Sequence, residues 1–358
     1  MTATPDCMSD TPSPLAPAGG RAAIIAEVGL NHGGDADLAW EMIESAWEHG
    51  ADLVKLQSFA PGGLLHPSLP YAASMEGMML SLRQHEALFE RARRQGIALI
   101  TTPFDAPTLD LCTRFRIAAV KVASMDLDNT AHLRAVARTG LPVILSCGMG
   151  DHADIGKALA TLRESGATDV TLLHCISDYP ARLEDMQLAE MPRLAARFGV
   201  PVGLSDHSLG LEASRMALAL GARVIERHFT TDPALMERIP DADHDISITP
   251  AQLRELRLAA ERTALALGGA ERVLAPQESA GRTASRRGLY ARTRLAAGHI
   301  LRAEDVTALR PVAALPASAL DAVLGRPCPC ELAPLAPIPA SMLPSHEEAV
   351  TDDKEGAA

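Results

Sequence analysis

The sequence predicts an α/β protein, with a closed (β/α)8 TIM barrel followed by a small, mainly-β domain. Three observations predict the barrel. Eight short, almost wholly apolar runs recur between residues 22 and 229, which is typical of parallel strands covered on both faces. Helical stretches separate these runs. Each run also ends in polar residues, and the active site of such a barrel lies at the carboxyl ends of its strands. The chain is therefore predicted to be an enzyme.

The predicted strands and helices alternate along the barrel. The strands are Ala22–Val28, Asp52–Gln57, Ile97–Thr102, Ala119–Ser124, Pro142–Ser146, Val170–Cys175, Val202–Ser205 and Arg223–Phe229. Helices predicted between them include Asp37–His49, Arg83–Gln95, Asp151–Glu164, Met186–Phe198 and Leu209–Leu220. A last barrel helix begins at Thr249-Pro250, because proline is favoured in the first helical turn, and it ends near Leu267, before two glycines.

The chain divides into five predicted segments. They are a disordered tail (1–20), the barrel (21–268), a linker (269–284), the small domain (285–342) and a disordered acidic tail (343–358). The first tail lacks the basic and apolar regions of a signal peptide. The linker is polar, without hydrophobic periodicity. The small domain is at the lower edge of what folds unaided, so we expect it to dock on another surface.

Composition excludes several classes of function. A net charge of −12 argues against general binding to nucleic acid or to an anionic membrane surface. No apolar run reaches the roughly 18 residues that a membrane-spanning helix needs. The six cysteines show no pairing or zinc-site pattern, and we interpret them as reduced thiols in a cytoplasmic protein.

Two lysines interrupt apolar strands, and both are predicted to point into the barrel. A buried ammonium group without a partner costs several kcal/mol, so Lys55 and Lys121 need counterions. Glu27, Glu226 or Asp206 could pair with them structurally. Alternatively, the lysines form a phosphate or carboxylate site. We favour the anion site because hydroxyl donors recur at the ends of successive strands, at Thr102, Ser124, Ser146 and Ser205.

Two histidines end consecutive strands, in Gly203-Leu-Ser-Asp-His207 and Ile225-Glu-Arg-His228-Phe. Neighbouring strands lie about 4.8 Å apart, so both imidazoles could bind one metal ion. Glu226 and Asp243 are close in sequence and could supply oxygen ligands. This donor set suits a divalent ion such as Mn²⁺, with Zn²⁺ and Fe²⁺ as alternatives.

Two further histidines and two glycine turns also lie near predicted strand ends. His32 and His174 are interpreted as structural, because a single histidine at a strand end is usually an ordinary hydrogen-bonded residue. Gly33-Gly34 and Gly148-Met-Gly150 connect strands to helices, where backbone N–H groups can approach an anion. Glycine is common in such turns for conformational reasons, so this signal alone is weak.

Seven motifs stand in order along the chain and together resemble the N-acetylneuraminate (sialic acid) synthase family. They are Ile24-Ile-Ala-Glu-Val-Gly-Leu-Asn-His32, Val54-Lys-Leu-Gln57, Thr102-Pro-Phe104, Leu145-Ser-Cys-Gly-Met149, Leu173-His-Cys175 with Tyr179-Pro180, Gly203-Leu-Ser-Asp-His207 and Glu226-Arg-His-Phe-Thr230. The segment from Arg286 to Gly325 resembles that family's antifreeze-like domain. The resemblance covers roughly residues 22 to 340.

The resemblance implies condensation of phosphoenolpyruvate with an open-chain N-acetylhexosamine such as N-acetylmannosamine, giving a nonulosonic acid and phosphate. It implies a phosphoenolpyruvate site made of Lys55, Thr102, Lys121, Ser124, Ser146, Ser177 and Ser205. It implies Mn²⁺ binding by His207 and His228, and contacts with the sugar from Glu27, Gln57, Tyr179 and Asp243. Arg310 of the small domain would read the sugar's acyl group across a homodimer, with the small domain reaching the partner barrel.

The catalytic residues are predicted among the carboxylates Glu27, Asp243 and Glu226. Glu27 or Asp243 would activate water or transfer a proton, since a positioned carboxylate suits either role. Departures from the family pattern fall on sugar recognition: Asp126, the apolar-rich 59–81 loop, and Val312-Ala-Ala after Arg310-Pro311. We therefore expect an acceptor that is not the usual one, or one that is substituted differently.

Three alternatives stay open. A legionaminic, pseudaminic or deaminated nonulosonic acid synthase would share all of these motifs. Synthases that use sugar phosphates are less similar, because they lack the small C-terminal domain. A non-catalytic sugar-binding barrel is disfavoured by the intact set of Glu27, Lys55, Lys121, His207 and His228.

Overall fold

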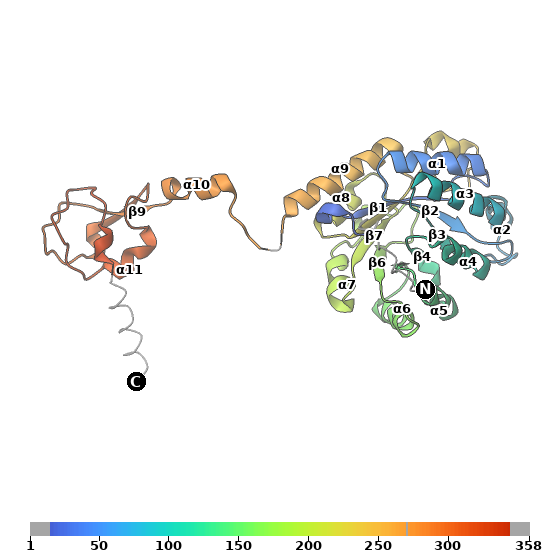
Figure 1. The fold of residues 1–358 in the computed structure, drawn as a ribbon, viewed down its shortest axis with the longest axis horizontal. Helices are drawn as coiled ribbons and strands as arrows, with labels where there is room; N and C mark the ends of the chain where they lie inside the picture. Colours follow the sequence, from blue (N-terminus) through green and yellow to red (C-terminus); the bar gives the residue numbers. More distant parts are fainter. Residues whose placement is uncertain (1–14, 270, 344–358) are drawn as a thin grey trace, which may run out of the picture. The chain divides into compact units, whose positions relative to one another are not determined.

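Eight parallel strands close into a barrel in the computed structural model of the chain, which describes residues 15–269 and 271–343 (Figure 1). The strands are β1 (Ala23–Gly29), β2 (Leu53–Ser58), β3 (Leu99–Pro103), β4 (Val120–Val122), β5 (Val143–Ser146), β6 (Val170–Cys175), β7 (Val202–Asp206) and β8 (Val224–His228). Each strand pairs with the next, and β8 closes the barrel on β1. The predicted barrel is confirmed, with strand ends displaced by no more than two residues.

Helices lie around the outside of this barrel (Figure 1). They are α1 (Ala36–Glu48), α2 (Ala72–Gly77), α3 (Leu82–Gln95), α4 (Ala106–Phe115), α5 (Thr130–Arg138), α6 (His152–Glu164), α7 (Glu190–Phe198), α8 (Glu212–Ala219) and α9 (Pro250–Leu267). The prediction that α7 begins at Met186 is wrong. Met186 is buried and mimics the first position of an apolar helix face, but Gln187 has a positive φ of 44°, which prevents a continuous helix.

Side-chain caps explain several helix starts. In α3, Ser81 accepts a hydrogen bond from the backbone N–H of Gln84, whose side chain bonds back to the Ser81 N–H. Thr249 and Gln252 form the same capping box at the start of α9. These reciprocal bonds satisfy N–H groups that have no partner within the helix. The predicted start of α9 at Thr249-Pro250 is therefore confirmed.

The barrel core is aliphatic and continuous. Every residue of β1 is buried, and Ile24 and Ile25 are fully excluded from solvent. Helix side chains such as Trp40, Met42 and Ile43 of α1 pack onto the outer face of the strands. Burial of this apolar surface is the main stabilising contribution, at about 25 cal/mol per Å². This packed core fixes the positions of the strand ends relative to one another.

The chain splits into two compact units between Gly268 and Gly269. The second unit contains α10 (Pro276–Ser285), α11 (Leu320–Val323) and an antiparallel pair of strands, β9 (Gly288–Ala291) and β10 (Val306–Leu309). A separate small core forms around Leu289, Val306, Val323 and Ile338. This unit therefore has a hydrophobic centre of its own.

Helix α10 occupies much of the segment predicted to be a linker. None of its residues is buried, so it shows no apolar stripe and gives no helical periodicity in the sequence. The two predicted tails lie largely outside the described residues, as does Cys7. The five described cysteines are free. Among residues 15–269 and 271–343, no helix is both long and apolar enough to cross a bilayer.

One glycine of the barrel wall allows close approach of two strands. A Cβ atom added to Gly203 of β7 would overlap the carbonyl oxygen of Val224 and lie 2.8 Å from Leu173 Cδ2. We predict that Gly203→Ala lowers the free energy of unfolding by about 1–3 kcal/mol, because β7 and β8 must separate. Thermal unfolding followed by circular dichroism measures this change.

The matched control is Gly156→Ala in α6. There the nearest atom to an added Cβ is Phe198 Cε1 at 3.6 Å, an ordinary contact. Alanine is favoured over glycine inside a helix by about 0.5–1 kcal/mol, so this variant should be as stable as the parent or more stable. Equal effects of the two substitutions would contradict the explanation based on β7–β8 packing.

Candidate active site

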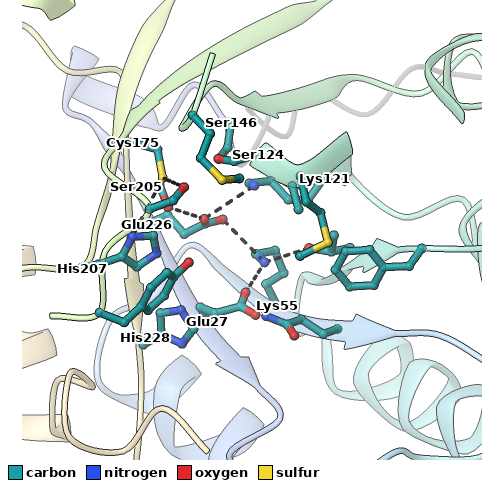
Figure 2. Close-up of a pocket in the computed structure, with 18 of the residues that line it drawn as sticks. Glu27, Lys55, Lys121, Ser124, Ser146, Cys175, Ser205, His207, Glu226 and His228 are labelled. Carbon is teal, nitrogen blue, oxygen red and sulfur yellow. Dashed lines mark hydrogen bonds and ion pairs between the residues drawn. The ribbon is translucent and has the colours of Figure 1, made fainter. Parts of the chain in front are cut away.

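A cavity of about 280 Å³ opens among the residues at the carboxyl ends of the barrel strands (Figure 2). Nearly all of the predicted site residues line it. They are Glu27, Lys55, Gln57, Thr102, Lys121, Ser124, Ser146, Ser177, Tyr179, Ser205, His207, Glu226 and His228. The residues singled out from separate strands thus converge on one cavity, where parallel-barrel enzymes place their chemistry.

Strand register explains this convergence. Glu27 of β1 is in register with Lys55 of β2 on one side and with His228 of β8 on the other. Ser205 of β7 is likewise in register with Glu226. Because side chains alternate along a strand, Glu226 and His228 lie on the same face of β8, toward the interior.

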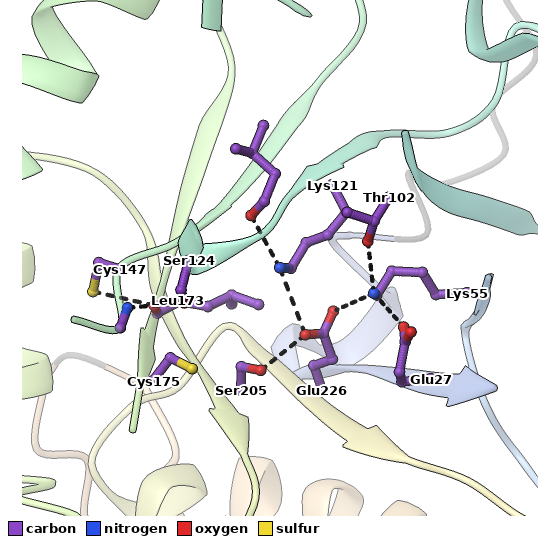
Figure 3. Close-up of polar contacts among 12 residues, drawn as sticks. Glu27, Lys55, Thr102, Lys121, Ser124, Cys147, Leu173, Cys175, Ser205 and Glu226 are labelled. Carbon is purple, nitrogen blue, oxygen red and sulfur yellow. Dashed lines mark hydrogen bonds and ion pairs between the residues drawn. The ribbon is translucent and has the colours of Figure 1, made fainter. Parts of the chain in front are cut away.

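Four ionisable side chains form a connected chain across the cavity floor (Figure 3). Lys55 makes an ion pair with Glu27, and its Nζ lies 3.8 Å from Glu226 Oε2. The other carboxylate oxygen of Glu226, Oε1, is 3.8 Å from Lys121 Nζ. Two lysines and two glutamates, all of them buried, therefore neutralise one another.

Hydroxyl and carbonyl groups complete these contacts. Lys55 donates a hydrogen bond to Thr102 Oγ1 at 2.9 Å. Lys121 donates to the Val122 carbonyl at 3.0 Å. Ser205 donates to Glu226 Oε1 at 2.9 Å. Each charged group thus keeps a polar partner even though it is removed from water, as burial requires.

The two glutamates differ in acidity. Burial raises the pKa of Glu27, and the neighbouring Glu226 adds to this effect against the opposing ammonium of Lys55. Burial acts in the same direction on Glu226, but Lys121 and Lys55 outweigh it and hold its pKa below the ordinary value. Burial lowers the pKa of Lys121. Of the two carboxyl groups, Glu27 is thus the one more easily protonated.

The structure brings together both lysines and two of their three suggested counterions. Glu27 and Glu226 pair with the lysines, whereas Asp206 does not. Asp206 pairs instead with Arg227, with 2.7 Å between Asp206 Oδ2 and Arg227 Nη1. The side chain of Asp206 leaves the strand on the opposite face from Ser205 and His207, which line the cavity.

A second set of polar side chains lies around the turn after β5, at Gly148. The backbone N–H of Gly148 donates to Ser124 Oγ at 3.0 Å. A Cβ added to Gly148 would lie 2.8 Å from Ser124 Oγ and would overlap Ser177 Oγ, so these two hydroxyls flank the glycine. Ser146 Oγ is buried and has no hydrogen-bond partner among the described residues. The Ser146 hydroxyl can therefore donate a hydrogen bond into the cavity, which is also lined by the ammonium groups of Lys55 and Lys121.

The histidine pair fits a metal ion in several respects. The imidazole centroids of His207 and His228 are 5.5 Å apart. His207 Nδ1 lies 2.9 Å from the Ile176 carbonyl and donates to it, so in the neutral ring Nε2 carries the lone pair that a metal ion could bind. His228 Nδ1 is buried without a hydrogen-bond partner among residues 15–269 and 271–343, and it lies 3.5 Å from Asp243 Oδ2.

The charge state of His228 and the side chains near the two histidines determine how well this pair suits a metal ion. Burial, reinforced by His207, lowers the pKa of His228 well below its ordinary value, so His228 is the neutral imidazole that metals bind. Tyr179 covers the pair, with its ring centroid 4.2 Å from that of His207. Within the described residues, no three His, Cys, Asp or Glu side chains group so as to hold a metal ion. Water or substrate oxygens would therefore complete the coordination.

One buried ion pair beside these histidines, Asp206–Arg227, was not predicted. Arg227 is 1% exposed and donates to Asp206, to the Ser208 carbonyl at 2.7 Å and to the Gly210 carbonyl at 2.9 Å. Arg227 and Asp206 directly precede His228 and His207 in the sequence, respectively. The pair therefore fixes both metal-ligand candidates from the outer face of the barrel. The signal that could have identified it is an arginine inside an apolar strand.

The remaining predicted residues lie elsewhere. Asp243 does not line the cavity but approaches His228. Arg310 belongs to the second unit, where it is exposed, so its role at the barrel stays a prediction. His32 Nδ1 accepts a hydrogen bond from the Gly34 N–H at 3.0 Å, and His174 lies 2.7 Å from the Met186 carbonyl. Neither of these histidines lines the cavity, which agrees with their structural interpretation.

Several lining residues were not predicted as site residues. They are Leu64, Met75, Phe104, Ala123, Met125, Met149 and Cys175. Cys175 is buried, with its Sγ 3.9 Å from His207 Nδ1. Phe104, Met125 and Met149 follow closely after strand ends. Their positions after strand ends could have identified these three residues, but apolar side chains are not the donors or acids expected in an anion or metal site.

Comparison with known proteins identifies relatives of both units. The NeuB family matches residues 42–272, and the SAF domain matches residues 286–344. An uncharacterised protein of Methanocaldococcus jannaschii is 36% identical over 303 residues, covering 85% of this chain and 89% of that protein. N,N'-diacetyllegionaminic acid synthase of Campylobacter jejuni is 33% identical over 319 residues, covering 85% of this chain and 94% of that protein. The crystal structure of N-acetylneuraminic acid synthetase from Leptospira borgpetersenii has a TM-score of 0.69 and 32% identity, covering 73% and 90% of the two chains.

The buried Asp206–Arg227 pair generates a stability prediction. We expect Arg227→Met to lower the free energy of unfolding by about 3–5 kcal/mol, because it leaves Asp206 as an uncompensated buried charge. Arg215→Met is the control, since Arg215 pairs with Glu255 on the exposed surface between α8 and α9. That exposed pair should contribute no more than about 1 kcal/mol. Urea unfolding of both variants measures the difference, and similar losses would contradict the assignment.

Proposed function

The chain belongs to the NeuB family of nonulosonic acid synthases, and from this premise we propose that it condenses phosphoenolpyruvate with an open-chain N-acetylhexosamine. The products are a nonulosonic acid, such as N-acetylneuraminate, and phosphate. The observation that carries the proposal is that two buried lysines, the histidine pair and Ser146, whose hydroxyl has no hydrogen-bond partner in the described part of the chain, line one cavity. A legionaminic, pseudaminic or deaminated nonulosonic acid synthase would use the same chemistry with another acceptor.

Phosphoenolpyruvate would bind over the cavity floor. Lys55 and Lys121 would contact its phosphate and carboxylate, and the nearby hydroxyls would donate hydrogen bonds to the same oxygens. The hydroxyls are those of Thr102, Ser124, Ser146, Ser177 and Ser205. Charge-assisted hydrogen bonds of this kind are roughly twice as strong as neutral ones. Because the lysines are already neutralised by two glutamates, an incoming anion is favoured when one of those carboxylates takes up a proton.

The reaction balances with one water molecule. The C3 carbon of phosphoenolpyruvate bonds to the aldehyde carbon of the sugar, and water adds to C2. The C2–O bond to phosphate then breaks, leaving a 2-keto acid. Glu27 is the group we assign to proton transfer at the aldehyde oxygen or at the attacking water, because its raised pKa favours a carboxyl that can hold and release a proton. Asp243, beside His228, is the alternative for either step.

His207 and His228 would hold a divalent metal ion, which we propose to be Mn²⁺. When bound, such an ion polarises a carbonyl oxygen as a Lewis acid. Tyr179, which covers His207, would exclude water from this side of the cavity and contact the sugar together with Gln57. Arg310 would reach a partner barrel in a homodimer and bind the acyl group of the sugar. We further propose that the enzyme acts in the cytoplasm.

Phosphate release tests the proposed function directly. We expect release from phosphoenolpyruvate in the presence of Mn²⁺ and one of N-acetylmannosamine, mannose or a di-acetamido sugar, with the nine-carbon acid detected by mass spectrometry. Chelation with EDTA should abolish release, and added Mn²⁺ should restore it. Folded, metal-loaded protein that releases no phosphate with any of these acceptors would favour the non-catalytic sugar-binding barrel instead.

Ser146 provides a sharper test of the anion site. Because Ser146 Oγ has no hydrogen-bond partner in the described residues, Ser146→Ala should leave the melting temperature unchanged. It should raise KM for phosphoenolpyruvate by about tenfold or more, the loss expected for a hydrogen bond to a charged group. Steady-state kinetics and thermal unfolding measure the two effects.

Ser58→Ala is the matched control. Ser58 is fully buried at the end of β2, and its Oγ lies 2.6 Å from Thr101 Oγ1 rather than in the cavity. This variant should lose about 1 kcal/mol of stability and keep its KM for phosphoenolpyruvate. A melting temperature that falls in Ser146→Ala without a change in KM would exclude Ser146 from the anion site.

A further inference from the structure

The side chain of Asn31 links three parts of the barrel mouth. Asn31 follows β1 and is fully buried, and its Nδ2 donates to the Phe229 carbonyl and to Ser247 Oγ, both at 2.9 Å. Phe229 directly follows His228 at the end of β8, and Ser247 belongs to the segment between β8 and α9. Both hydrogens of one amide are therefore used to hold this segment to the end of β8.

The hydroxyl of Ser247 extends this link to Asp243. Ser247 Oγ donates to the backbone carbonyl of Asp243 at 2.6 Å, which closes the turn between the two residues. The N–H of Ile248, the next residue, donates to the His228 carbonyl at 2.8 Å, so the turn is also attached to β8. The backbone of Asp243 is thus held in a defined place beside the end of β8.

The carboxylate of Asp243 approaches one edge of the His228 imidazole. Asp243 Oδ2 is 3.5 Å from His228 Nδ1, which is buried, whereas the imidazole itself lines the cavity (Figure 2). The Nε2 edge of the ring is therefore the one presented to the cavity. His207 is arranged in the same way, since its Nδ1 donates to the Ile176 carbonyl. Each imidazole directs Nδ1 toward an oxygen of the chain and leaves Nε2 for a metal ion.

An oxygen partner on the second ring nitrogen matters for metal binding. Such a partner fixes the tautomer and orientation of the imidazole and raises its basicity toward the metal. The Ile176 carbonyl is in this position for His207, and Asp243 is in this position for His228. No three His, Cys, Asp or Glu side chains in the described ranges group so as to hold a metal ion. Asp243 therefore acts on a metal ion through His228, not by direct coordination.

We propose that Asn31 and Ser247 are positioning residues for the metal ion at the histidine pair. They hold Asp243 against His228 Nδ1, and this contact sets the affinity of the pair for a divalent ion. The inference rests on the proposed function, which assigns such an ion to the pair. Asp243 is half-buried, so loss of the Ser247 hydroxyl would free its carboxylate to turn toward solvent.

The test measures Mn²⁺ binding to the full chain, without phosphoenolpyruvate or sugar, from the electron paramagnetic resonance signal of free Mn²⁺. Ser247→Ala should weaken the affinity about tenfold, the lower end of the effect of losing such a partner. Asp243→Ala should weaken it by at least as much. In the Asp243→Ala background, Ser247→Ala should add little, because both substitutions remove one contact. Asn31→Ala should show the same loss as Ser247→Ala, with circular dichroism to verify that it folds.

Thr139→Ala is the matched control for Ser247→Ala. Thr139 is half-buried after α5 and does not line the cavity, and its Oγ1 donates to the Val136 carbonyl at 2.7 Å. This variant loses a comparable bond from a hydroxyl to a nearby backbone carbonyl, so its melting temperature should fall while its Mn²⁺ affinity stays unchanged. Calorimetry in EDTA should give Ser247→Ala the parent's affinity for phosphoenolpyruvate, because Lys55 and Lys121 are untouched.

The outcomes separate this inference from the proposed function. Unchanged Mn²⁺ affinity in Ser247→Ala would overturn the inference, and so would an equal loss of phosphoenolpyruvate affinity, which indicates general disruption of the site. Additive losses in the double variant would show that Ser247 does not act through Asp243. A parent chain that binds no Mn²⁺ would also overturn the inference, and phosphate release would then decide separately whether condensation occurs. If the variants weaken Mn²⁺ binding as expected but no phosphate is released, the positioning role stands and the proposed condensation fails.

Discussion

The structure of the site depends on the mutual neutralisation of four charges buried in the barrel mouth. Lys55 and Lys121 cannot be removed from water without counterions, and Glu226 serves both of them while Glu27 pairs with Lys55 (Figure 3). Because these groups stand on different strands, their pairing also links the strands across the barrel interior. Under the proposed function, the incoming anion would replace a carboxylate as a partner of the lysines.

A second buried ion pair, between Arg227 of β8 and Asp206 of β7, lies on the outer face of the barrel strands. Arg227 and Asp206 alternate along β8 and β7 with the residues that face the cavity. Through Arg227, the Ser208 and Gly210 carbonyls are joined to the end of β8. The positions of the candidate site residues thus depend on both faces of a strand: the inner side chains line the cavity, and the outer Asp206–Arg227 pair fixes the strand ends from which they extend.

The cavity combines two chemical environments. Its floor is charged, whereas part of its lining is apolar and comes from the loops after β2 to β5. Those loops contribute little to the barrel core, so their residues can change without loss of the fold.

The sequence alone determined the barrel, its strand order and nearly all of the polar cavity residues, because buried parallel strands are apolar runs and most of the polar cavity residues lie at or just after the end of one. It also located α9 through its cap. It did not determine which carboxylate pairs with which lysine: Asp206 was as good a candidate as Glu226 until strand register placed it on the outer face. Nor did it identify Leu64 and Met75 as residues that line the cavity, since they come from a loop and a short helix without hydrophobic periodicity. Only tertiary structure decides such contacts, because they depend on which side of a strand faces inward and on how distant loops meet.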